Sequence, residues 1–561
     1  MPLSSHLFIR NMNLPVPVSS ASHAMLSVFA ANGIDRVFLV PGESYLGILD
    51  ALGDFPSIDV VTCRHESGAG FMACADARLT RRPGVVMVSR GPGAANAAIA
   101  IHTAEQDAIP LILVVGQVPK QRLRKGAFQE IDYGRMYGSV AKHVIEVTEP
   151  EALAAAAFDA IRIAGAGTPG PVVLVVPEDI QQQAVEASAW RATPAVPTLP
   201  EPVRVLELAG RLERAQRPLV IAGGVLDVPG GREALRRLAE HFAVPVAVSF
   251  RRHDLFPNDH ALYAGDLGLA NPEEQMRLFE SSDLVIALGS RVGDITTQGY
   301  RFPSHPVPAQ SFVHCHPDSA VVNRHLAAEM GFVCDPASLA AALVASNPSP
   351  SVGGRRAQWC ERLRDFATGY ARWPEPAADG AARAVDVARI LAKQMPGDAA
   401  ICLDAGAFAA PVYRHFPFCF PRRLMAPLSG AMGYGVPSAI ATQLRYPGQK
   451  TVCLVGDGGF LMTGNEIIAA VERRLPILFI LVNNQCYGSI RIHQNRHYPG
   501  RHVGTSLSNP DFVRIAEAYG LQARRVTREC ELDEAIAQAF AADEPCLIEV
   551  VTEPPGGPLP S

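Results

Sequence analysis

The sequence predicts an α/β protein with three Rossmann-like domains, each built on a doubly wound parallel sheet. Short apolar runs recur along the chain, end in glycine or polar turns, and alternate with amphipathic segments. This alternation is typical of buried parallel strands joined by crossover helices. The chain of 561 residues is also too long for one hydrophobic core. Proline-rich stretches at 192–202 and 347–354 separate it into three units of domain size.

These two stretches set the predicted domain boundaries. The serine- and proline-rich residues 1–20 lack the apolar core of a secretory signal and are expected to be a disordered lead-in, with Met12 as an alternative start. A charged helical segment ending near Thr368 is expected between the second and third domains. The domains themselves are expected at 21–190, 202–345 and 377–555.

Composition narrows the classes of function. The formal net charge is −5 and the isoelectric point about 6.4, which gives no indication of nucleic-acid or anionic-membrane binding. No apolar run approaches the roughly 20 residues of a membrane-spanning helix. The 11 cysteines form no Cys-x-x-Cys pair, which argues against a structural zinc site and a secreted disulfide framework. The predicted location is the reducing cytoplasm.

An internal repeat links the first and third domains. In each, an apolar strand leads into a glycine turn, and a proline opens the next strand 17 residues later. Pro110 follows Gly93 in the first copy, and Pro476 follows Gly459 in the second. The equal spacing predicts two copies of one supersecondary unit.

The second copy carries the residues best suited to bind a ligand. Asp457 and Asn484 follow two apolar runs, 451–455 and 477–482, with a predicted helix at 465–474 between them. Both residues are therefore expected at the carboxyl ends of neighbouring strands, where open α/β sheets bind ligands. Their oxygens suit Mg²⁺ or Ca²⁺, and the adjacent glycines let backbone N–H groups approach a phosphate. A lone Gly-Asp-Gly is more often a turn, but with the paired asparagine it predicts a divalent cation that holds a diphosphate.

Several segments resemble enzymes that use thiamine diphosphate. Gly456-Asp457-Gly458-Gly459 with Asn483-Asn484 resembles the signature of that superfamily. Arg64-His65-Glu66 resembles a segment of the acetohydroxyacid synthase and benzoylformate decarboxylase group. The resemblance spans roughly residues 21–551, and its motifs are specific for the cofactor and much less specific for the substrate. Further segments resemble acetolactate synthase large subunits, namely 90–96, 116–119, 127–130 and 430–437.

The resemblance implies roles for individual residues. Glu66 would protonate or hydrogen-bond the distant ring nitrogen of the cofactor's aminopyrimidine; the alternative is that it only caps the helix that begins there. Met432 would lie beneath the cofactor, although core filling is the default role of a methionine. The Gly430 carbonyl would accept the amino group of the cofactor. The magnesium ligands would be the side chains of Asp457 and Asn484 and the backbone oxygen of Cys486. The diphosphate would lie between two turns, made of Gly456, Gly458 and Gly459 and of Asp404, Ala405 and Gly406.

The substrate pocket is less well specified. Gln129 and His493 are the candidate catalytic residues, with His102 and Arg491 as further candidates, and a surface or core histidine is an equally good interpretation of His493. The polar tract 493–504 is expected to be an irregular loop that closes over the site. In the family the pyrimidine and diphosphate sites meet across a subunit interface, which implies a homodimer or homotetramer.

Two sets of positions depart from acetolactate synthases. Ala407-Phe408 replaces a Gln-His pair and His493 replaces a tryptophan, and both family positions shape the second-substrate pocket. At the family's flavin positions, Thr168 replaces an arginine, Glu178 replaces a lysine, and 291–295 replaces an Arg-Phe-Asp-Asp-Arg run. Because cationic donors are lost, FAD is predicted to bind weakly or not at all.

The sequence therefore predicts a thiamine diphosphate- and Mg²⁺-dependent carboligase or decarboxylase of a 2-keto acid, with a carbonyl acceptor, similar to acetolactate synthase. Three alternatives stay open: a decarboxylase of an aromatic or bulky 2-keto acid, a flavin-dependent oxidase of the same superfamily, and a non-catalytic cofactor-binding subunit. The joint presence of Glu66, Asp457 and Asn484 argues against the last. No residue specifies the donor or the acceptor.

Overall fold

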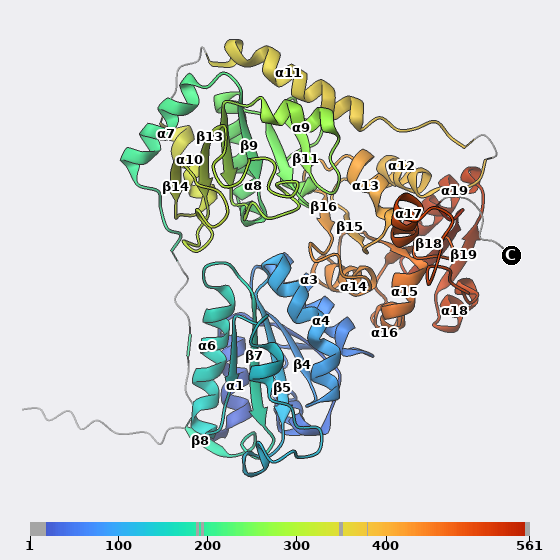
Figure 1. Cartoon of the computed structure of the whole chain (residues 1–561). Coiled ribbons are helices and arrows are strands. Elements are labelled where there is room, and N and C mark those ends of the chain that lie inside the picture. Colours follow the sequence, from blue (N-terminus) through green and yellow to red (C-terminus); the bar gives the residue numbers. More distant parts are fainter. Residues whose placement is uncertain (1–17, 187–189, 192–195, 347–351, 378–379, 556–561) are drawn as a thin grey trace, which may run out of the picture.

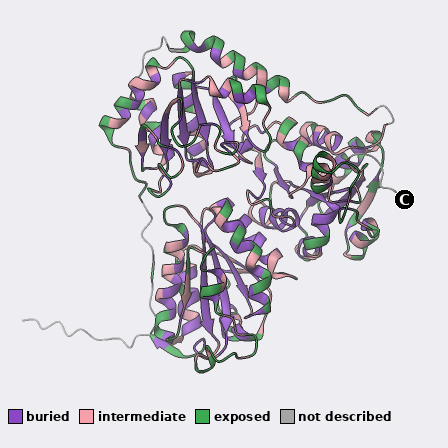
Figure 2. Cartoon of the chain, in the orientation of Figure 1, coloured by how far each residue is buried: buried purple, intermediate pink, exposed green. Residues whose placement is uncertain are grey.

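Three parallel sheets form the framework of the molecule. The computed structural model describes residues 18–186, 190–191, 196–346, 352–377 and 380–555. Within these ranges, three six-stranded sheets are parallel throughout and carry helices on both faces (Figure 1), and a two-stranded antiparallel sheet joins two short segments. The strands are buried along most of their length, and exposed residues gather on the outer faces of helices and in loops (Figure 2). The predicted α/β class with three parallel sheets is confirmed.

The N-terminal sheet has the strand order β3-β2-β4-β5-β7-β6. The inner strands β5 and β7 are buried at every residue, because a parallel strand covered on both faces must be apolar on both. The strands are β2 (Arg36–Leu39), β3 (Asp59–Thr62), β4 (Gly84–Val88), β5 (Leu111–Gln117), β6 (His143–Glu146) and β7 (Pro171–Pro177). The helices are α1 (Ala21–Ala31), α2 (Leu46–Leu52), α3 (Glu66–Thr80), α4 (Pro92–Asp107), α5 (Tyr133–Tyr137) and α6 (Leu153–Gly165).

The C-terminal sheet repeats this topology with the order β16-β15-β17-β18-β20-β19. Numbered within each domain, both orders are 2-1-3-4-6-5, which confirms the internal repeat. The N-terminal copy has Gly91 and Val118 where this copy has Asp457 and Asn484. The strands are β15 (Ala400–Leu403), β16 (Arg423–Met425), β17 (Thr451–Gly456), β18 (Ile477–Asn483), β19 (Gln522–Val526) and β20 (Cys546–Val551). The helices are α12 (Ala384–Gln394), α13 (Ala410–His415), α14 (Gly435–Arg445), α15 (Asp457–Thr463), α16 (Ile467–Glu472), α17 (Gly488–His497), α18 (Phe512–Ala518) and α19 (Glu529–Ala541).

The central sheet has a different order, β11-β10-β9-β12-β13-β14, which is 3-2-1-4-5-6 within the domain. Its strand order therefore reverses between β9 and β12, the place where doubly wound sheets open a crevice. The strands are β9 (Pro218–Ala222), β10 (Val246–Ser249), β11 (Tyr263–Leu267), β12 (Leu284–Leu288), β13 (Ser311–Cys315) and β14 (Met330–Phe332). The helices are α7 (Pro202–Arg214), α8 (Gly231–Phe242), α9 (Glu273–Glu280), α10 (Pro336–Ala345) and α11 (Val352–Tyr370).

The charged segment predicted to lie between domains is α11, and it packs on the central domain. The guanidinium of Arg356 is fully buried and donates to the carbonyls of Leu212, Ala215 and Phe242. Trp359 donates its indole N–H to the Pro218 carbonyl at 2.9 Å. This helix, which lies beyond residue 345, thus packs on the central domain because carbonyls at the ends of α7 and α8 accept its arginine.

Three local predictions differ from the structure. Residues 18–20, assigned to the disordered lead-in, form β1 (Val18–Ser20), which pairs with β8 (Ala184–Glu186); residues 1–17 lie outside the described ranges. The helix after β17 begins at Asp457 rather than 465, and a 3₁₀ turn, η7 (Gly464–Glu466), divides it. The tract from 493 is helical as far as His497, within α17, so only its later part is irregular.

A buried charge cluster joins the three domains. The Asp227 carboxylate of the central domain lies 2.9 Å from Arg232, 3.3 Å from Arg423 of the C-terminal domain and 3.5 Å from Arg81 of the N-terminal domain. Burial alone raises the pKa of Asp227, but the three guanidinium groups lower it well below its usual value.

None of the helices in the described ranges combines the length and apolar composition that a membrane crossing needs.

We expect Asp227→Asn to destabilise the protein strongly. The change removes the carboxylate that pairs with Arg81 and Arg423 and leaves Arg232 paired with Asp254 at 2.7 Å, so the free energy of unfolding should fall by about 3 kcal/mol. Calorimetric unfolding of the full chain measures this. The control is Glu233→Gln on α8, where an exposed carboxylate pairs with Arg236 and Arg237, and the expected loss is below about 1 kcal/mol. Equal effects of the two variants would contradict the junction role.

Candidate active site

The predicted ligand residues lie side by side at the edge of the C-terminal sheet. β17 and β18 pair in parallel register from Thr451↔Ile477 to Gly456↔Val482. Asp457 is the first residue of α15, and Asn484 follows the last residue of β18. The Asp457 side chain is buried, and its two oxygens accept N–H groups from Gly458 at 2.9 Å and from Asn509 at 2.8 Å. Burial raises the pKa of Asp457, and these donors oppose that rise.

Asn509 is a site residue that the sequence reasoning missed. Its amide group also donates to Asn483 Oδ1 at 2.9 Å, and its own Oδ1 is buried without a hydrogen-bond partner. The Asn484 side-chain oxygen faces the backbone N–H of Cys486 at 3.1 Å. Carboxylate and amide oxygens therefore gather on one loop edge, and the unpartnered oxygen is an available acceptor. This donor set fits a hard divalent cation.

Across the ranges listed above, no group of three or more His, Cys, Asp or Glu side chains is arranged to hold a metal ion. A cation at this edge would therefore rely on the carboxylate of Asp457, on amide and backbone oxygens, and on groups from a bound ligand, as Mg²⁺ commonly does.

Glycine at the turn after β17 permits close packing. A Cβ atom at Gly456 would lie 2.7 Å from the Phe408 ring, and one at Gly458 would lie 2.6 Å from the Tyr487 ring. The turn is therefore bounded by two aromatic rings. Phe408, which the sequence placed at the second-substrate pocket, lies directly against this predicted diphosphate turn, and its ring also approaches Gly406.

The Asp404 side chain fixes the backbone of the loop before α14. Its carboxylate is fully buried and accepts the backbone N–H groups of Ala405 at 2.6 Å, Gly433 at 3.0 Å and Gly435 at 3.4 Å. Burial raises the pKa of Asp404 to about 6, although these N–H groups lower it. The sequence predicted that Asp404 lines the diphosphate site, but its side chain is committed to the loop before α14. Asp404 Oδ2 also lies beside the predicted diphosphate turn, since a Cβ atom at Gly459 would lie 2.7 Å from it.

The loop that carries Gly430 and Met432 is also held from the N-terminal domain. Asp107, at the end of α4, accepts the backbone N–H groups of Leu428 and Ser429, both at 2.9 Å. Gly430 has φ +69°, a left-handed conformation that favours glycine, and Met432 is half-buried. Met432 is thus not a core-filling methionine, and the loop it occupies has its backbone fixed by Asp107 and Asp404.

The Glu66 side chain does not cap α3, because His65 does so. The ring Nδ1 of His65, the N-cap of α3, accepts the Ser67 N–H at 3.2 Å. The half-buried Glu66 carboxylate instead accepts the Asn96 amide N–H at 2.9 Å, and a Cβ at Gly93 would lie 3.2 Å from it. The capping interpretation of Glu66 is therefore wrong.

The predicted substrate residues are dispersed. Gln129 is exposed with φ +63°, and its backbone packs against Gly91 at the start of α4, the turn that also borders Glu66. His493 is exposed on α17 and stacks on His497. His102 is exposed on α4. Arg491 differs from all of these, because it is fully buried and its Nε and one Nη have no hydrogen-bond partner.

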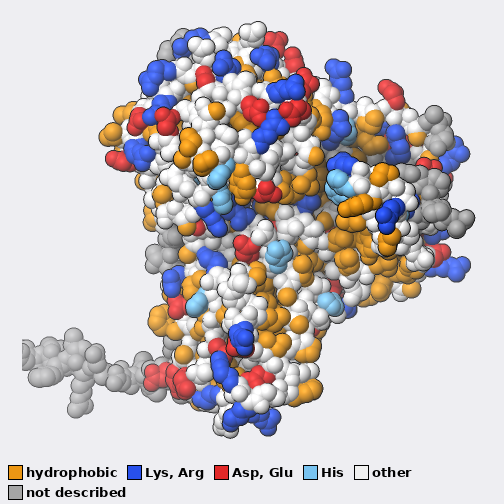
Figure 3. All heavy atoms as spheres, viewed as in Figure 1, with side chains coloured by type: hydrophobic (Ala, Val, Ile, Leu, Met, Phe, Trp, Pro, Cys, Tyr) orange, Lys and Arg blue, Asp and Glu red, His pale blue; other side chains and the backbone are white. Residues whose placement is uncertain are grey.

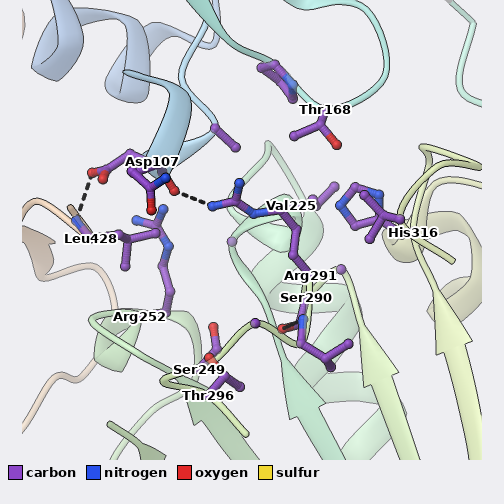
Figure 4. A pocket seen from close by; sticks show the side chains of 18 of the residues that line it. Asp107, Thr168, Val225, Ser249, Arg252, Ser290, Arg291, Thr296, His316 and Leu428 are labelled. Atoms are coloured by element: carbon purple, nitrogen blue, oxygen red, sulfur yellow. Dashed lines mark hydrogen bonds between the residues drawn. The ribbon is translucent and has the colours of Figure 1, made fainter. Parts of the chain in front are cut away.

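A separate cavity of about 730 Å³ lies between the central and N-terminal domains. It opens at the β9/β12 switch point, and basic and histidine side chains gather over this junction (Figure 3). Arg252 and Arg291 extend from the central domain toward Asp107 (Figure 4). Arg291 donates to the Gln106 carbonyl, whereas two nitrogens of Arg252 lack partners.

Two of the replaced flavin positions can now be located. Thr168 lines this cavity, and both its N–H and its hydroxyl donate to the Asp318 carboxylate, at 2.9 and 2.6 Å. Glu178 instead pairs with Arg90 at 2.7 Å. Where the family has an arginine, the cavity wall thus carries Thr168, which is bonded to the Asp318 carboxylate, while Arg252 presents two unpartnered nitrogens to the cavity.

Fold and site together define a thiamine diphosphate enzyme, with a duplicated α/β domain and an oxygen-rich sheet edge in the second copy. Comparisons with known families agree. The N-terminal, central and C-terminal domain models of the thiamine pyrophosphate enzymes match residues 19–136, 205–343 and 404–550. The chain therefore belongs to the thiamine pyrophosphate enzyme family.

Curated relatives match over nearly the whole chain. The probable acetolactate synthase large subunit of Methanocaldococcus jannaschii is 29% identical, over 96% of this chain and 94% of the relative. The acetolactate synthase large subunit of Parasynechococcus marenigrum is 30% identical, over 96% and 88%. The isozyme 2 large subunit of Escherichia coli is 29% identical, over 93% of both chains. The protein is an acetolactate synthase-like enzyme of this superfamily.

We expect Asp404→Asn to change how stability depends on pH. A buried acid whose pKa is raised to about 6 stabilises the fold below its unfolded pKa, and that contribution is lost as the pH rises to about 6. Relative to the variant, the natural protein should therefore lose of the order of 2 kcal/mol between about pH 4 and pH 6. Thermal unfolding of both proteins across this range measures the difference. A difference that does not vary with pH would contradict the account of Asp404.

Proposed function

We propose that the protein is a thiamine diphosphate- and Mg²⁺-dependent carboligase that decarboxylates a 2-keto acid and passes the acyl group to a carbonyl acceptor. The observation that carries this proposal is the group of Asp457, Asn484 and Asn509 oxygens at the carboxyl ends of β17 and β18. Asp457 and Asn484 would bind the cation through their side chains, and Cys486 would bind it through its carbonyl. Backbone N–H groups of the Gly456–Gly459 turn would bind the diphosphate.

When bound, thiamine diphosphate supplies a nucleophilic carbon and an electron sink for cleaving a 2-keto acid. In the proposed enzyme, Glu66 holds or delivers a proton at the aminopyrimidine ring, and Asn96 orients its carboxylate at 2.9 Å. The Gly430 carbonyl would accept the amino group of the cofactor, and Met432 would support its rings. Support for these roles comes from the backbone bonds that fix the loop before α14.

Arg491 is the best candidate to bind an anionic group in the site. A buried guanidinium with unpartnered nitrogens is costly unless an anion pairs with it. It lies on α17, directly after the loop of Asn484 and Cys486. We assign it to the substrate carboxylate, and we keep Gln129 and His493 as the candidate catalytic residues of the substrate pocket.

The functional unit is proposed to be a homodimer or a dimer of dimers with the site at its interface. Large apolar side chains are exposed around both halves of the site, which is unusual for a surface that stays in water. They are Leu46, Ile99 and Phe128 in the N-terminal domain and Leu461 and Met462 in α15.

The substrate is tested by a proton NMR time course with thiamine diphosphate, Mg²⁺ and pyruvate, with and without an added aldehyde. Acetolactate or an acyloin is the expected product. Free acetaldehyde alone would favour the rival function, a decarboxylase that forms no carbon–carbon bond. That rival has specific support, because Phe408 and His493 replace the residues that shape the family's second-substrate pocket. Unconsumed pyruvate, with cofactor bound, would exclude pyruvate as the donor.

We expect Glu66→Gln to lower turnover by about 100-fold or more, because the amide cannot transfer the proton. Binding of thiamine diphosphate and Mg²⁺, measured by calorimetric titration, should change little, because the cation and the diphosphate are held in the other domain. Asn96→Ala should give a smaller loss of the same kind. Unchanged turnover in Glu66→Gln would remove the proton-transfer role.

FAD is predicted to bind weakly or not at all. The Asp318 carboxylate beside Thr168 disfavours an anionic dinucleotide, and the guanidinium of Arg291 already donates to a carbonyl. The purified protein should therefore lack a stoichiometric flavin absorption band. If one flavin per chain is found, Arg252 becomes its expected anchor, and Arg252→Ala should release it.

A further inference from the structure

Glu466 is a buried acid that the proposed chemistry does not use. It ends η7, between α15 and α16, and is fully buried. Its carboxylate crosses to the N-terminal domain and accepts the backbone N–H of Arg64, with oxygens at 3.0 and 3.2 Å, and that of His65 at 2.8 Å. These two residues immediately precede Glu66. One carboxylate from the C-terminal domain therefore holds the turn that presents Glu66.

The N-terminal domain is shaped to admit this carboxylate. A Cβ atom at Gly68, in the first turn of α3, would lie 2.6 Å from Glu466 Oε1. Glycine at this position lets the carboxylate reach the turn. On either side, Arg473 pairs with Asp59 at 3.0 Å, and Glu472 pairs with Arg64. The contact is thus a docked interface between two domains of the same chain.

The electrostatic surroundings tie Glu466 to Glu66. Burial raises the pKa of Glu466 to about 7, the two backbone N–H groups and Arg64 oppose the rise, and the negative charge of Glu66 adds to it. The other titratable or charged groups around this contact are Cys63, His65, Glu472 and Arg473.

We propose that Glu466 is a positioning residue for Glu66. By binding the two N–H groups of the preceding turn, it fixes where α3 begins and so where the Glu66 carboxylate meets Asn96 and the aminopyrimidine. This inference rests on the proposed function, in which Glu66 is the proton-transferring group. It adds that the C-terminal domain sets the geometry of that group as well as binding the diphosphate.

The test compares Glu466→Gln with the control Glu472→Gln, which removes a neighbouring, more exposed carboxylate from the same docking face. The first readout needs no cofactor: hydrogen–deuterium exchange of the peptide covering 62–67 in the full chain. Glu466→Gln should speed exchange at the Arg64 and His65 amides about tenfold or more, because a neutral amide oxygen is a weaker acceptor than a carboxylate and the amide NH₂ group would replace the oxygen that faces the Arg64 N–H at 3.2 Å. Glu472→Gln should leave both amides protected.

The second readout is the pH profile of deuterium exchange at the reactive carbon of bound thiamine diphosphate. Glu466→Gln should slow this exchange about tenfold or more and shift its pH dependence, with cofactor affinity within about threefold. Gly68→Ala, which crowds Glu466 without altering any charge, should act in the same direction and decides the matter if Glu466→Gln does not fold.

The outcomes separate the two proposals. If Glu66→Gln slows the exchange but Glu466→Gln and Gly68→Ala do not, the positioning role of Glu466 is wrong and the proposed function stands. If Glu66→Gln has no effect either, the proposed function itself fails. Equal amide protection in Glu466→Gln and in the natural protein would also overturn the inference.

Discussion

Buried carboxylates that accept backbone N–H groups hold this active site together. Asp107 of the N-terminal domain binds the loop at 428–429, Asp404 binds the glycines before α14, and Glu466 binds the turn before Glu66. Burial raises the pKa of all three, so each is held at a cost in solvation that its N–H partners only partly offset. These hydrogen bonds fix the backbones of loops from two domains, and a cofactor would lie between those loops.

The duplicated sheet explains why these loops can converge. In both outer domains the third and fourth strands end at turns on the carboxyl edge, and the connection between them packs as a helix. The second copy places Asp457 and Asn484 on these turns, whereas the first has Gly91 and Val118 there and carries Glu66 after its edge strand β3. In the proposed enzyme, one duplicated unit would thus supply both the anion-binding half and the proton-transferring half of the site. The ion pairs of Asp227 with Arg81 and Arg423 hold the central domain against both outer domains.

Apolar runs predicted β17 and β18 because a doubly covered parallel strand is hydrophobic along its whole length. The start of α15 was not predicted, because Gly458 and Gly459 disfavour a helix by propensity and only their close packing against Tyr487 and Asp404 explains it. Asn509 carried no signal, since it comes from a polar segment 52 residues after Asp457. The bonds from Asp404 to the N–H groups of Gly433 and Gly435 could not be inferred either, because these partners lie about 30 residues later, in another loop.

The most direct test of the account is calorimetric titration of the purified protein with thiamine diphosphate, in Mg²⁺ and then in excess chelator, repeated with Asp457→Ala and Asn509→Ala. The account predicts one binding event per chain that needs Mg²⁺, is lost in Asp457→Ala and is weakened in Asn509→Ala. Binding that is indifferent to the chelator and to Asp457, or no binding at all, would contradict the cation and diphosphate site on which the rest of the account depends.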